Sequence, residues 1–182
     1  MTNKKWIIVD RDGTLIVEKN YLHCVEDIEL LPGAAEGLRL LEEAGCNIIV
    51  ASNQSGVGRG YFSSDEVVSV NNAVADMFKN EGANIKDFFF CPHKPSDNCC
   101  CRKPLTGLAE QAMTKYNFSV EDIVCVIGDK SSDIGLGKNL GRPAVLVMTG
   151  YGNEEFKKGV RGTYNTGDLS EAAFLIIKEL LK

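Results

Sequence analysis

Short runs of apolar residues recur along the chain, separated by longer stretches in which apolar and polar residues alternate with helical spacing. The short runs are mainly apolar and do not alternate with polar residues, which is typical of strands buried on both faces of a parallel sheet. Their lengths also suit strands better than buried helices. We therefore predict strands over KWIIV (5–9), CNIIVAS (46–52), IKDFFFC (85–91), IVCVIGD (123–129) and PAVLVM (143–148).

Helix signals fill the intervals between these runs. Pro32-Gly33 opens a leucine-rich segment with a natural stop at Gly45, and Ser63 with Glu66 three residues later forms a capping-box signature. Further helices are expected from Pro104 to about Tyr116, over SSDIGLGKNLG, and over SEAAFLIIKELLK. This alternation predicts an α/β fold, a Rossmann-like doubly wound parallel sheet with helices on both faces, built as a single domain over residues 1–182.

Composition and charge narrow the function classes. Apolar residues make up 44% of the chain and charged residues 25%, as in ordinary globular proteins. The formal net charge of -5 argues against nucleic acid as a partner, since that binding needs many uncompensated basic contacts. No apolar run is long enough for a membrane span, and the N-terminal residues do not resemble a cleavable signal, so we expect a cytoplasmic protein without membrane association.

Polar side chains that could take part in catalysis or metal binding lie where the predicted strands end. Asp10 and Asp12 follow the first strand, and GDKSSD (128–133) follows the fourth. An isolated D-x-D is more often a turn, but parallel strands end at the same edge of a sheet, where ligands bind. Carboxylates from two strand ends would form a site for a hard cation such as Mg²⁺.

Four motifs then carry a family resemblance: VDRDGTL, ASNQ, CRKP and GDKSSD, in this order, resemble those of the haloacid dehalogenase superfamily of phosphohydrolases. The similarity runs from about residue 5 to about residue 150. It implies a phosphatase in which Asp10 is the nucleophile and forms an aspartyl-phosphate, and Asp12 is the general acid and base. Mg²⁺ would lie on Asp10, the backbone carbonyl of Asp12, and Asp129. Ser52 with Asn53 would hydrogen-bond the phosphoryl oxygens, Lys103 would balance their charge, and Asp133 would lie outside the ligand set.

Within the superfamily, Cys-x-His followed by Cys-x-Cys-Arg-Lys-Pro resembles a branch of zinc-carrying phosphatases. The branch holds D-glycero-D-manno-heptose 1,7-bisphosphate 7-phosphatases, which act in ADP-heptose and surface-glycan precursor synthesis, and histidinol-phosphate phosphatases. SNQSGVGRG is more similar to the heptose enzymes, so we favour a sugar-phosphate substrate and keep histidinol phosphate as the alternative. The resemblance implies substrate contacts from Glu18, Lys19, Asn20, Tyr21, Ser52, Asn53, Gln54, Ser55, Arg102, Lys103 and Lys130.

Two further expectations follow from this branch. Arg102 would bind the distal phosphate, because a guanidinium can donate two parallel hydrogen bonds to it. No large insertion follows the first or third motif, which predicts that there is no substantial cap domain. We also expect a monomer.

The stretch CPHKPSDNCCCRKP (91–104) holds four of the seven cysteines and one of the two histidines. Reduced cytoplasmic thiols favour metal binding over disulfides. Cys91, His93, Cys99 and Cys101 suit a tetrahedral structural Zn²⁺ in a loop over residues 91–101. In an extended stretch Cys99 and Cys101 point to the same side and Cys100 points away. Unmetallated thiols are the alternative for this loop.

For the whole chain, two alternatives to a phosphatase stay open. One is a zinc-binding structural or regulatory module without turnover, and the other is a phosphotransferase or mutase that shares the aspartyl-phosphate. The complete set of candidate catalytic residues favours an enzyme, because a structural module has no need to keep all of them.

Overall fold

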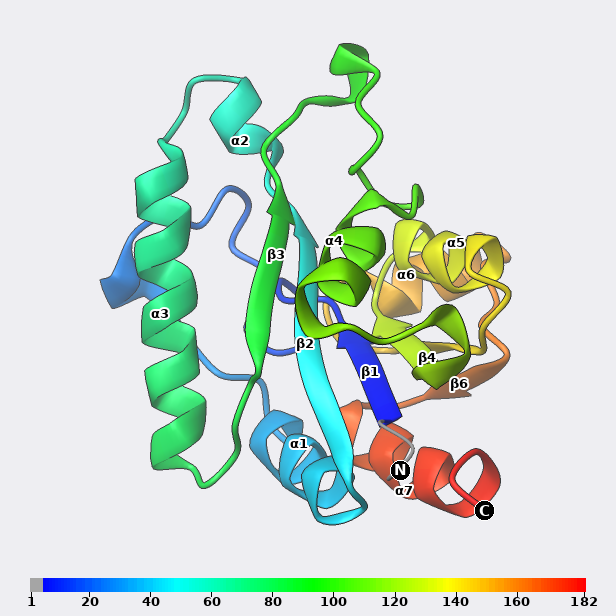
Figure 1. Cartoon of the computed structure of the whole chain (residues 1–182). Helices are drawn as coiled ribbons and strands as arrows, with labels where there is room; N and C mark the ends of the chain where they lie inside the picture. Colours follow the sequence, from blue (N-terminus) through cyan, green and yellow to red (C-terminus); the bar gives the residue numbers. More distant parts are fainter. Residues whose placement is uncertain (1–4) are drawn as a thin grey trace.

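The computed structural model describes residues 5–182. A six-stranded sheet, parallel throughout, forms its centre in the order β3-β2-β1-β4-β5-β6 (Figure 1). Register places Ile8 of β1 opposite Ile49 of β2 and Val126 of β4. The strands are β1 (Lys5–Val9), β2 (Cys46–Asn53), β3 (Asp87–Cys91), β4 (Ile123–Gly128), β5 (Ala144–Val147) and β6 (Tyr164–Thr166).

Helices cover both faces of this sheet, which confirms the predicted fold class. The α-helices are α1 (Ala34–Glu43), α2 (Ser55–Gly58), α3 (Ser64–Asn80), α4 (Gly107–Tyr116), α5 (Ser131–Asn139), α6 (Gly152–Lys157) and α7 (Leu169–Glu179). Three 3₁₀ turns are η1 (Val25–Asp27), η2 (Pro95–Asp97) and η3 (Val120–Asp122). Among the described helices none is both long and apolar enough to cross a membrane.

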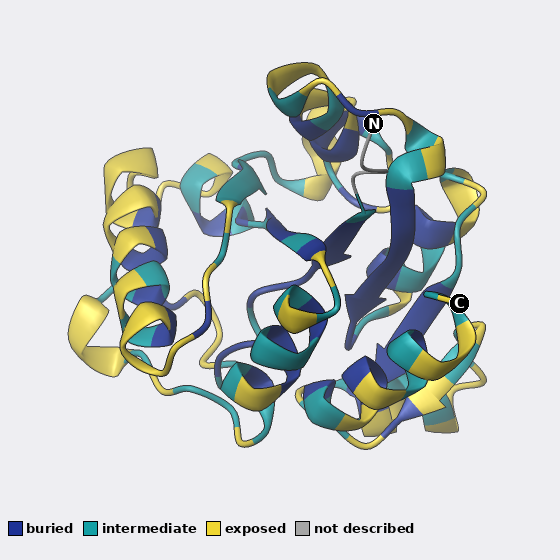
Figure 2. Ribbon diagram, turned by 60° about the horizontal axis from the view of Figure 1, so that its bottom comes forward, coloured by how far each residue is buried: buried dark blue, intermediate teal, exposed yellow. Residues whose placement is uncertain are grey.

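The strands divide their side chains between two cores, because successive residues of a strand point to opposite faces. Ile7 and Val9 face one core with buried side chains of α1, α3 and α7, whereas Trp6 and Ile8 face a second core with α4 and α5. Figure 2 shows the buried strands enclosed by helices whose outer faces are exposed. Burial on both faces explains why the sequences of β1, β2, β4 and β5 are mainly apolar without alternation.

The predicted capping box at the start of α3 is confirmed. The Ser63 hydroxyl accepts a hydrogen bond from the Glu66 N–H at 3.2 Å, and the Ser63 N–H donates to the Glu66 carboxylate at 2.7 Å. Both contacts satisfy N–H groups that have no partner inside a helix. They define the start of α3, which packs Val70, Val74 and Phe78 against the sheet.

The prediction of Pro104 in the first turn of a helix is wrong, since α4 begins at Gly107. Pro104 follows a cis peptide bond and lies in a turn closed by the Leu105 N–H on the Arg102 carbonyl at 2.9 Å. Three further elements, α2, α6 and β6, were not predicted from the sequence. β6 is the short edge strand YNT, whose sequence contains no apolar run.

Candidate active site

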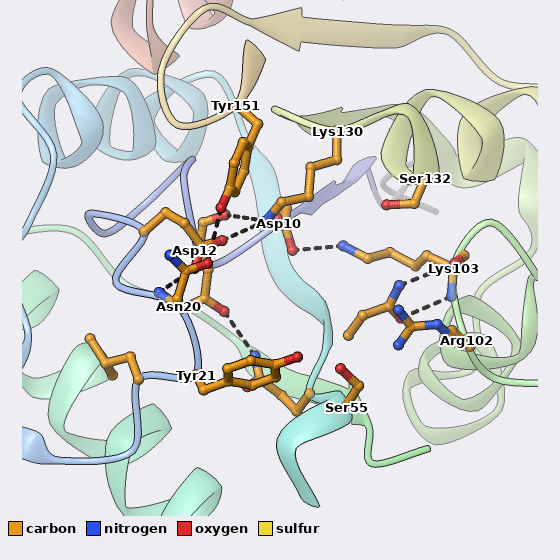
Figure 3. A pocket seen from close by; sticks show the side chains of 14 residues that line it. Asp10, Asp12, Asn20, Tyr21, Ser55, Arg102, Lys103, Lys130, Ser132 and Tyr151 are labelled. Atoms are coloured by element: carbon orange, nitrogen blue, oxygen red, sulfur yellow. Dashed lines mark hydrogen bonds and ion pairs between the residues drawn. The ribbon is translucent and has the colours of Figure 1, made fainter. Parts of the chain in front are cut away.

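The candidate catalytic residues meet at the carboxyl ends of three adjacent strands. Asp10 directly follows β1, and its N–H donates to the Ile127 carbonyl of β4 at 2.9 Å. Asn53 ends β2, and Asp129 directly follows β4. Parallel pairing of β2, β1 and β4 therefore brings residues more than 100 positions apart to one edge, shown from close by in Figure 3.

Lys103 is buried against Asp10. Its Nζ lies 2.6 Å from Asp10 Oδ1 and 2.6 Å from Asp133 Oδ1, and it also donates to the Ala51 carbonyl. Burial alone would lower the pKa of Lys103, but the two carboxylates outweigh it and the pKa is raised. For Asp10, burial opposes ionisation, yet the charges of Lys103 and Lys130 hold its pKa below the usual value. Asp10 is therefore ionised at neutral pH, as the predicted nucleophile has to be.

Asn53 fixes the backbone that carries Lys103. The Lys103 N–H donates to Asn53 Oδ1 at 3.0 Å, and Asn53 Nδ2 donates to the Lys103 carbonyl at 3.1 Å. Ser52, also predicted in the site, is buried beneath the pocket and accepts a hydrogen bond from Gln54 Nε2 at 3.3 Å. The ASNQ segment thus holds the CRKP segment in place and orients its lysine.

Asp129 has the properties of a cation ligand. Its Oδ2 accepts the Tyr151 N–H at 2.8 Å. Its buried Oδ1 has no hydrogen-bond partner among residues 5–182 and lies 3.9 Å from Lys130 Nζ. Burial, followed by the negative charge of Asp10, raises the pKa of Asp129 to about 8. Carboxylate oxygens of Asp10, Asp129 and Asp133 all lie within 4.8 Å of one another. A buried acidic group with an unpaired oxygen fits a hard divalent cation, whose charge would favour the ionised form.

Close packing explains the glycine of DRDGT. Gly13 has φ +89°, and a Cβ atom there would collide with the Asp129 carboxylate. Any other residue would meet both a conformational penalty and this collision. The glycine therefore lets the turn after β1 approach the acidic site.

Asp12 is held by three side-chain N–H groups. Arg11 Nε and Nη2 contact its carboxylate, with Nη2 to Oδ2 at 3.0 Å, and Gln54 Nε2 donates to Oδ2 at 2.8 Å. Arg11 Nη1 donates in turn to Asn71 Oδ1 of α3 at 2.8 Å. The sequence analysis did not assign Arg11, although its place between the two candidate aspartates was a signal.

The substrate candidates surround a cavity of ≈ 290 Å³ over Asp10. Lys19 is not among the lining residues, and its Nζ lies 3.5 Å from Glu29. The other candidates line the cavity, apart from Ser52 beneath it: Glu18, Asn20, Tyr21, Asn53, Gln54, Ser55, Arg102, Lys103 and Lys130. The cavity is small, which suits a compact polar ligand.

The Lys130 side chain contacts residues of two other segments around this cavity. Its Nζ pairs with Glu18 at 2.7 Å and lies 5.1 Å from the centre of the Tyr151 ring. The Tyr151 hydroxyl donates to Asn20 Oδ1 at 3.0 Å. Burial would lower the pKa of Lys130, but the charges of Asp10, Asp129 and Glu18 raise it, so the residue is a fixed cation. The sequence analysis missed Tyr151, although it follows the fifth strand closely enough for the strand-end argument to apply.

A second cluster lies in the loop after β3. Sulfur separations are 3.2 Å between Cys91 and Cys101, 3.6 Å between Cys91 and Cys99, and 3.7 Å between Cys99 and Cys101. His93 Nδ1 lies 3.3 Å from the Cys101 sulfur. Zinc–sulfur bonds of about 2.3 Å in a tetrahedron place sulfurs roughly 3.8 Å apart, so the four predicted ligands fit Zn²⁺. Cys100 is exposed and outside the cluster.

This loop leads directly into the active site. Arg102 and Lys103 follow the last candidate zinc ligand, and both line the cavity. Arg102 Nη1 donates to the His93 carbonyl at 3.2 Å, so the cluster also orients the arginine that the sequence analysis assigned to a distal phosphate.

Comparisons with known proteins agree with this site. A family model described as HAD-hydrolase-like matches residues 100–172. D-glycero-alpha-D-manno-heptose-1,7-bisphosphate 7-phosphatase of Photorhabdus laumondii is 38% identical, over 83% of this chain and 86% of that protein. The histidine biosynthesis bifunctional protein HisB of Legionella pneumophila is 36% identical over 76% of this chain, but only 40% of HisB is covered.

A solved structure gives the same assignment. The crystal structure of D,D-heptose 1,7-bisphosphate phosphatase from B. bronchiseptica, complexed with magnesium and phosphate, matches with a TM-score of 0.87 and 29% identity. The match covers 96% of this chain and 99% of that one. The resemblance read from the motifs is thus confirmed: the chain is a phosphatase and belongs to the heptose-bisphosphate phosphatase family of haloacid dehalogenase-like hydrolases.

Proposed function

We propose that this phosphatase removes the 7-phosphate of D-glycero-D-manno-heptose 1,7-bisphosphate through an aspartyl-phosphate on Asp10. The observation that carries the proposal is the distribution of cations in one small cavity. Lys103 lies against Asp10, and its neighbour Arg102 lines the same cavity from the same segment. Lys130 reaches the cavity from the turn between β4 and α5. Charged groups at separate positions suit a substrate with two phosphates, as the names of the relatives also indicate.

The proposed reaction has two steps. An Asp10 carboxylate oxygen attacks phosphorus while the phosphorus–oxygen bond to the sugar breaks, and Asp12 gives its proton to the departing sugar oxygen. Asp12 then takes a proton from water as the water attacks the phosphorus of the aspartyl-phosphate, which releases phosphate and restores Asp10. Lys103 and hydrogen bonds from the Ser52–Asn53 segment would neutralise and orient the phosphoryl oxygens.

Magnesium would be held by Asp10, the backbone carbonyl of Asp12, and Asp129. When bound, it supplies positive charge that lets an anionic nucleophile approach an anionic phosphate ester. The motif resemblance places Asp133 outside the ligand set, where it pairs with Lys103 at 2.6 Å. The unpaired oxygen of Asp129 supports that residue as a direct ligand.

The pKa of Asp129 leads to a prediction for metal binding. Below about pH 8 a proton occupies this carboxyl in the metal-free protein, so Mg²⁺ has to displace it. We expect Mg²⁺ affinity to rise from pH 6 to pH 8 and to level off above, measured by calorimetry with fluorescence or thermal shift as a second readout. Affinity that is constant across this range would contradict a ligand carboxyl whose pKa is raised to about 8.

We further propose that Cys91, His93, Cys99 and Cys101 hold a structural Zn²⁺. Cys101→Ser should abolish stoichiometric zinc and lower the melting temperature, because structural zinc contributes directly to folding free energy. Cys100→Ser is the matched control, since this neighbouring thiol is exposed and lies outside the cluster. Metal analysis and thermal unfolding should separate the two variants. Zinc-free protein from a freshly reduced preparation would contradict the assignment.

Histidinol phosphate remains the second candidate substrate because of the match to HisB. That relative is a longer bifunctional protein, and only 40% of it is covered. A histidinol monophosphate would leave one of the cationic positions without a phosphate partner, which favours the bisphosphate.

The proposal is tested by incubating the protein with heptose 1,7-bisphosphate and Mg²⁺. We expect phosphate release that EDTA stops and added Mg²⁺ restores, with heptose 1-phosphate identified by phosphorus NMR. Loss of the 1-phosphate instead would contradict the proposed regiochemistry. Transfer of phosphate to an added sugar, in place of release into water, would indicate a phosphotransferase.

A single domain over residues 1–182, a monomeric state and a cytoplasmic location stay predictions.

A further inference from the structure

We propose that Arg11, anchored by Asn71, is a positioning residue that holds the carboxylate of Asp12 for proton transfer to the leaving group. The inference rests on the proposed roles of Asp10 and Asp12. It concerns a residue and a helix, α3, that the proposed chemistry does not otherwise use.

The burial of Arg11 is the first observation. Only 1% of the residue is exposed, and it is the largest side chain in the described core with so little exposure. A buried guanidinium is unfavourable unless it is fully paired. Arg11 meets this requirement with Asp12 and Asn71, and both contacts lie beside the reaction centre rather than at the surface.

The geometry of the contact is the second observation. Arg11 Nε lies 3.1 Å from Asp12 Oδ2, and Arg11 Nη2 lies 3.0 Å from Asp12 Oδ1, so two N–H groups face two oxygens. Such a planar fork fixes the orientation of the carboxylate as well as its position. A lysine, with a single point charge, would not impose this orientation.

Asn71 connects this fork to the body of the fold. Its Oδ1 accepts from Arg11 Nη1 at 2.8 Å, and Asn71 is itself buried on the sheet-facing side of α3. The contact joins positions 60 residues apart. The side chain of Asp12, which is 15% exposed at the cavity, is therefore oriented by a helix packed behind the sheet. Gln54 contributes the remaining donor from the opposite segment.

The chemistry of the leaving group distinguishes positioning from a purely structural role. A sugar alkoxide is a poor leaving group and needs the proton of Asp12, whereas 4-nitrophenolate leaves readily without one. A misplaced Asp12 should therefore slow hydrolysis of the sugar phosphate more than hydrolysis of the aryl phosphate. General loss of structure would lower both rates together.

The experiment compares kcat/KM for heptose 1,7-bisphosphate and 4-nitrophenyl phosphate, because kcat/KM reports the step in which the leaving group departs. In Arg11→Met we expect the sugar phosphate value to fall at least about tenfold more than the aryl phosphate value. In Asp12→Asn the difference between the two losses of kcat/KM should be larger still. Adding Arg11→Met to Asp12→Asn should lower the sugar phosphate value by less than about threefold, because residues that act through each other are not additive.

Asn71→Ala keeps the inference testable if Arg11→Met does not fold. This variant should also lose more kcat/KM for the sugar phosphate than for the aryl phosphate. The difference should be smaller than in Arg11→Met, because Arg11 keeps its contact with Asp12. Arg11→Lys should lie between wild type and Arg11→Met. Thermal unfolding and zinc content identify variants that are merely unstable.

The inference would be overturned if Arg11→Met lowered kcat/KM equally for both substrates. If Arg11→Met cannot be obtained, it would be overturned by an Asn71→Ala variant in which the ratio of the two kcat/KM values is unchanged. Additive losses in the double variant would overturn it as well. Failure of the proposed function looks different, because Asp12→Asn would then show no dependence on the leaving group, or the wild type would release no phosphate.

Discussion

Asp10→Asn is expected to lower phosphate release by at least about 10⁴-fold, because the amide cannot attack phosphorus and no other carboxylate replaces it. The variant should keep its fold. Asparagine has almost the same shape, and Lys103 retains its contact with Asp133 at 2.6 Å. We expect destabilisation below the roughly 3–5 kcal/mol typical of a buried charge that loses its partner entirely. Steady-state kinetics and thermal unfolding measure the two effects.

The matched control is Asp133→Asn, which removes the other carboxylate on Lys103 and leaves the proposed nucleophile intact. This variant should retain at least about 100-fold more activity than Asp10→Asn. Intact-mass spectrometry after rapid acid quench should detect the aspartyl-phosphate in Asp133→Asn and not in Asp10→Asn. Substantial turnover by Asp10→Asn would contradict the assignment of the nucleophile.

Lys103→Met is the second change with a large expected effect. Activity should fall about 10³-fold, since the fixed charge that we propose lies next to the transferring phosphoryl group is lost. Stability should fall too, because Asp10 and Asp133 would face each other in a buried site without their shared cation. We expect a loss of roughly 3–5 kcal/mol at pH 7 in the absence of Mg²⁺.

The sign of the pH dependence follows from the pKa of each carboxyl. In the wild type the pKa of Asp10 is lowered, mainly because the charge of Lys103 overcomes burial, so its ion pair contributes stability at neutral pH that is lost in acid. Burial raises the pKa of Asp133 to about 6 even beside Lys103. Without the lysine both carboxyls protonate more readily. The difference in melting temperature between wild type and Lys103→Met should therefore shrink from pH 7 to pH 5.

Lys115→Met is the control for Lys103→Met. Lys115 also pairs with an aspartate at 2.6 Å, but its side chain is 58% exposed. Exposed pairs contribute about 0–1 kcal/mol, so this variant should unfold and turn over almost as the wild type does. Equal losses of stability in the two variants would contradict the role of burial at Lys103.

The sheet and the centre of the site could be predicted because their causes are local in the sequence. Apolar runs mark strands buried on both faces, and parallel strands bring their ends together, which placed Asp10 near Asp129 without any structure. The capping box at Ser63 was equally local. Spacing in an extended segment separated Cys100 from the candidate ligands Cys99 and Cys101, as the structure also does.

Long-range contacts account for what could not be predicted. The direction of the Arg11 side chain depends on Asn71, which lies on a different element 60 residues away. Lys19 has the same polar character as its neighbours Glu18 and Asn20, yet it pairs with Glu29 while they line the cavity. β6 depends on pairing with β5, since its own sequence lacks an apolar run.

The substrate is the central claim, and a kinetic comparison tests it most directly. Both anomers of D-glycero-D-manno-heptose 1,7-bisphosphate and histidinol phosphate should be assayed with Mg²⁺ and zinc-loaded protein under identical conditions. We predict that kcat/KM for at least one heptose anomer exceeds that for histidinol phosphate by about 100-fold or more, because only the bisphosphate can engage both cationic positions. A decisive preference for histidinol phosphate would contradict the account.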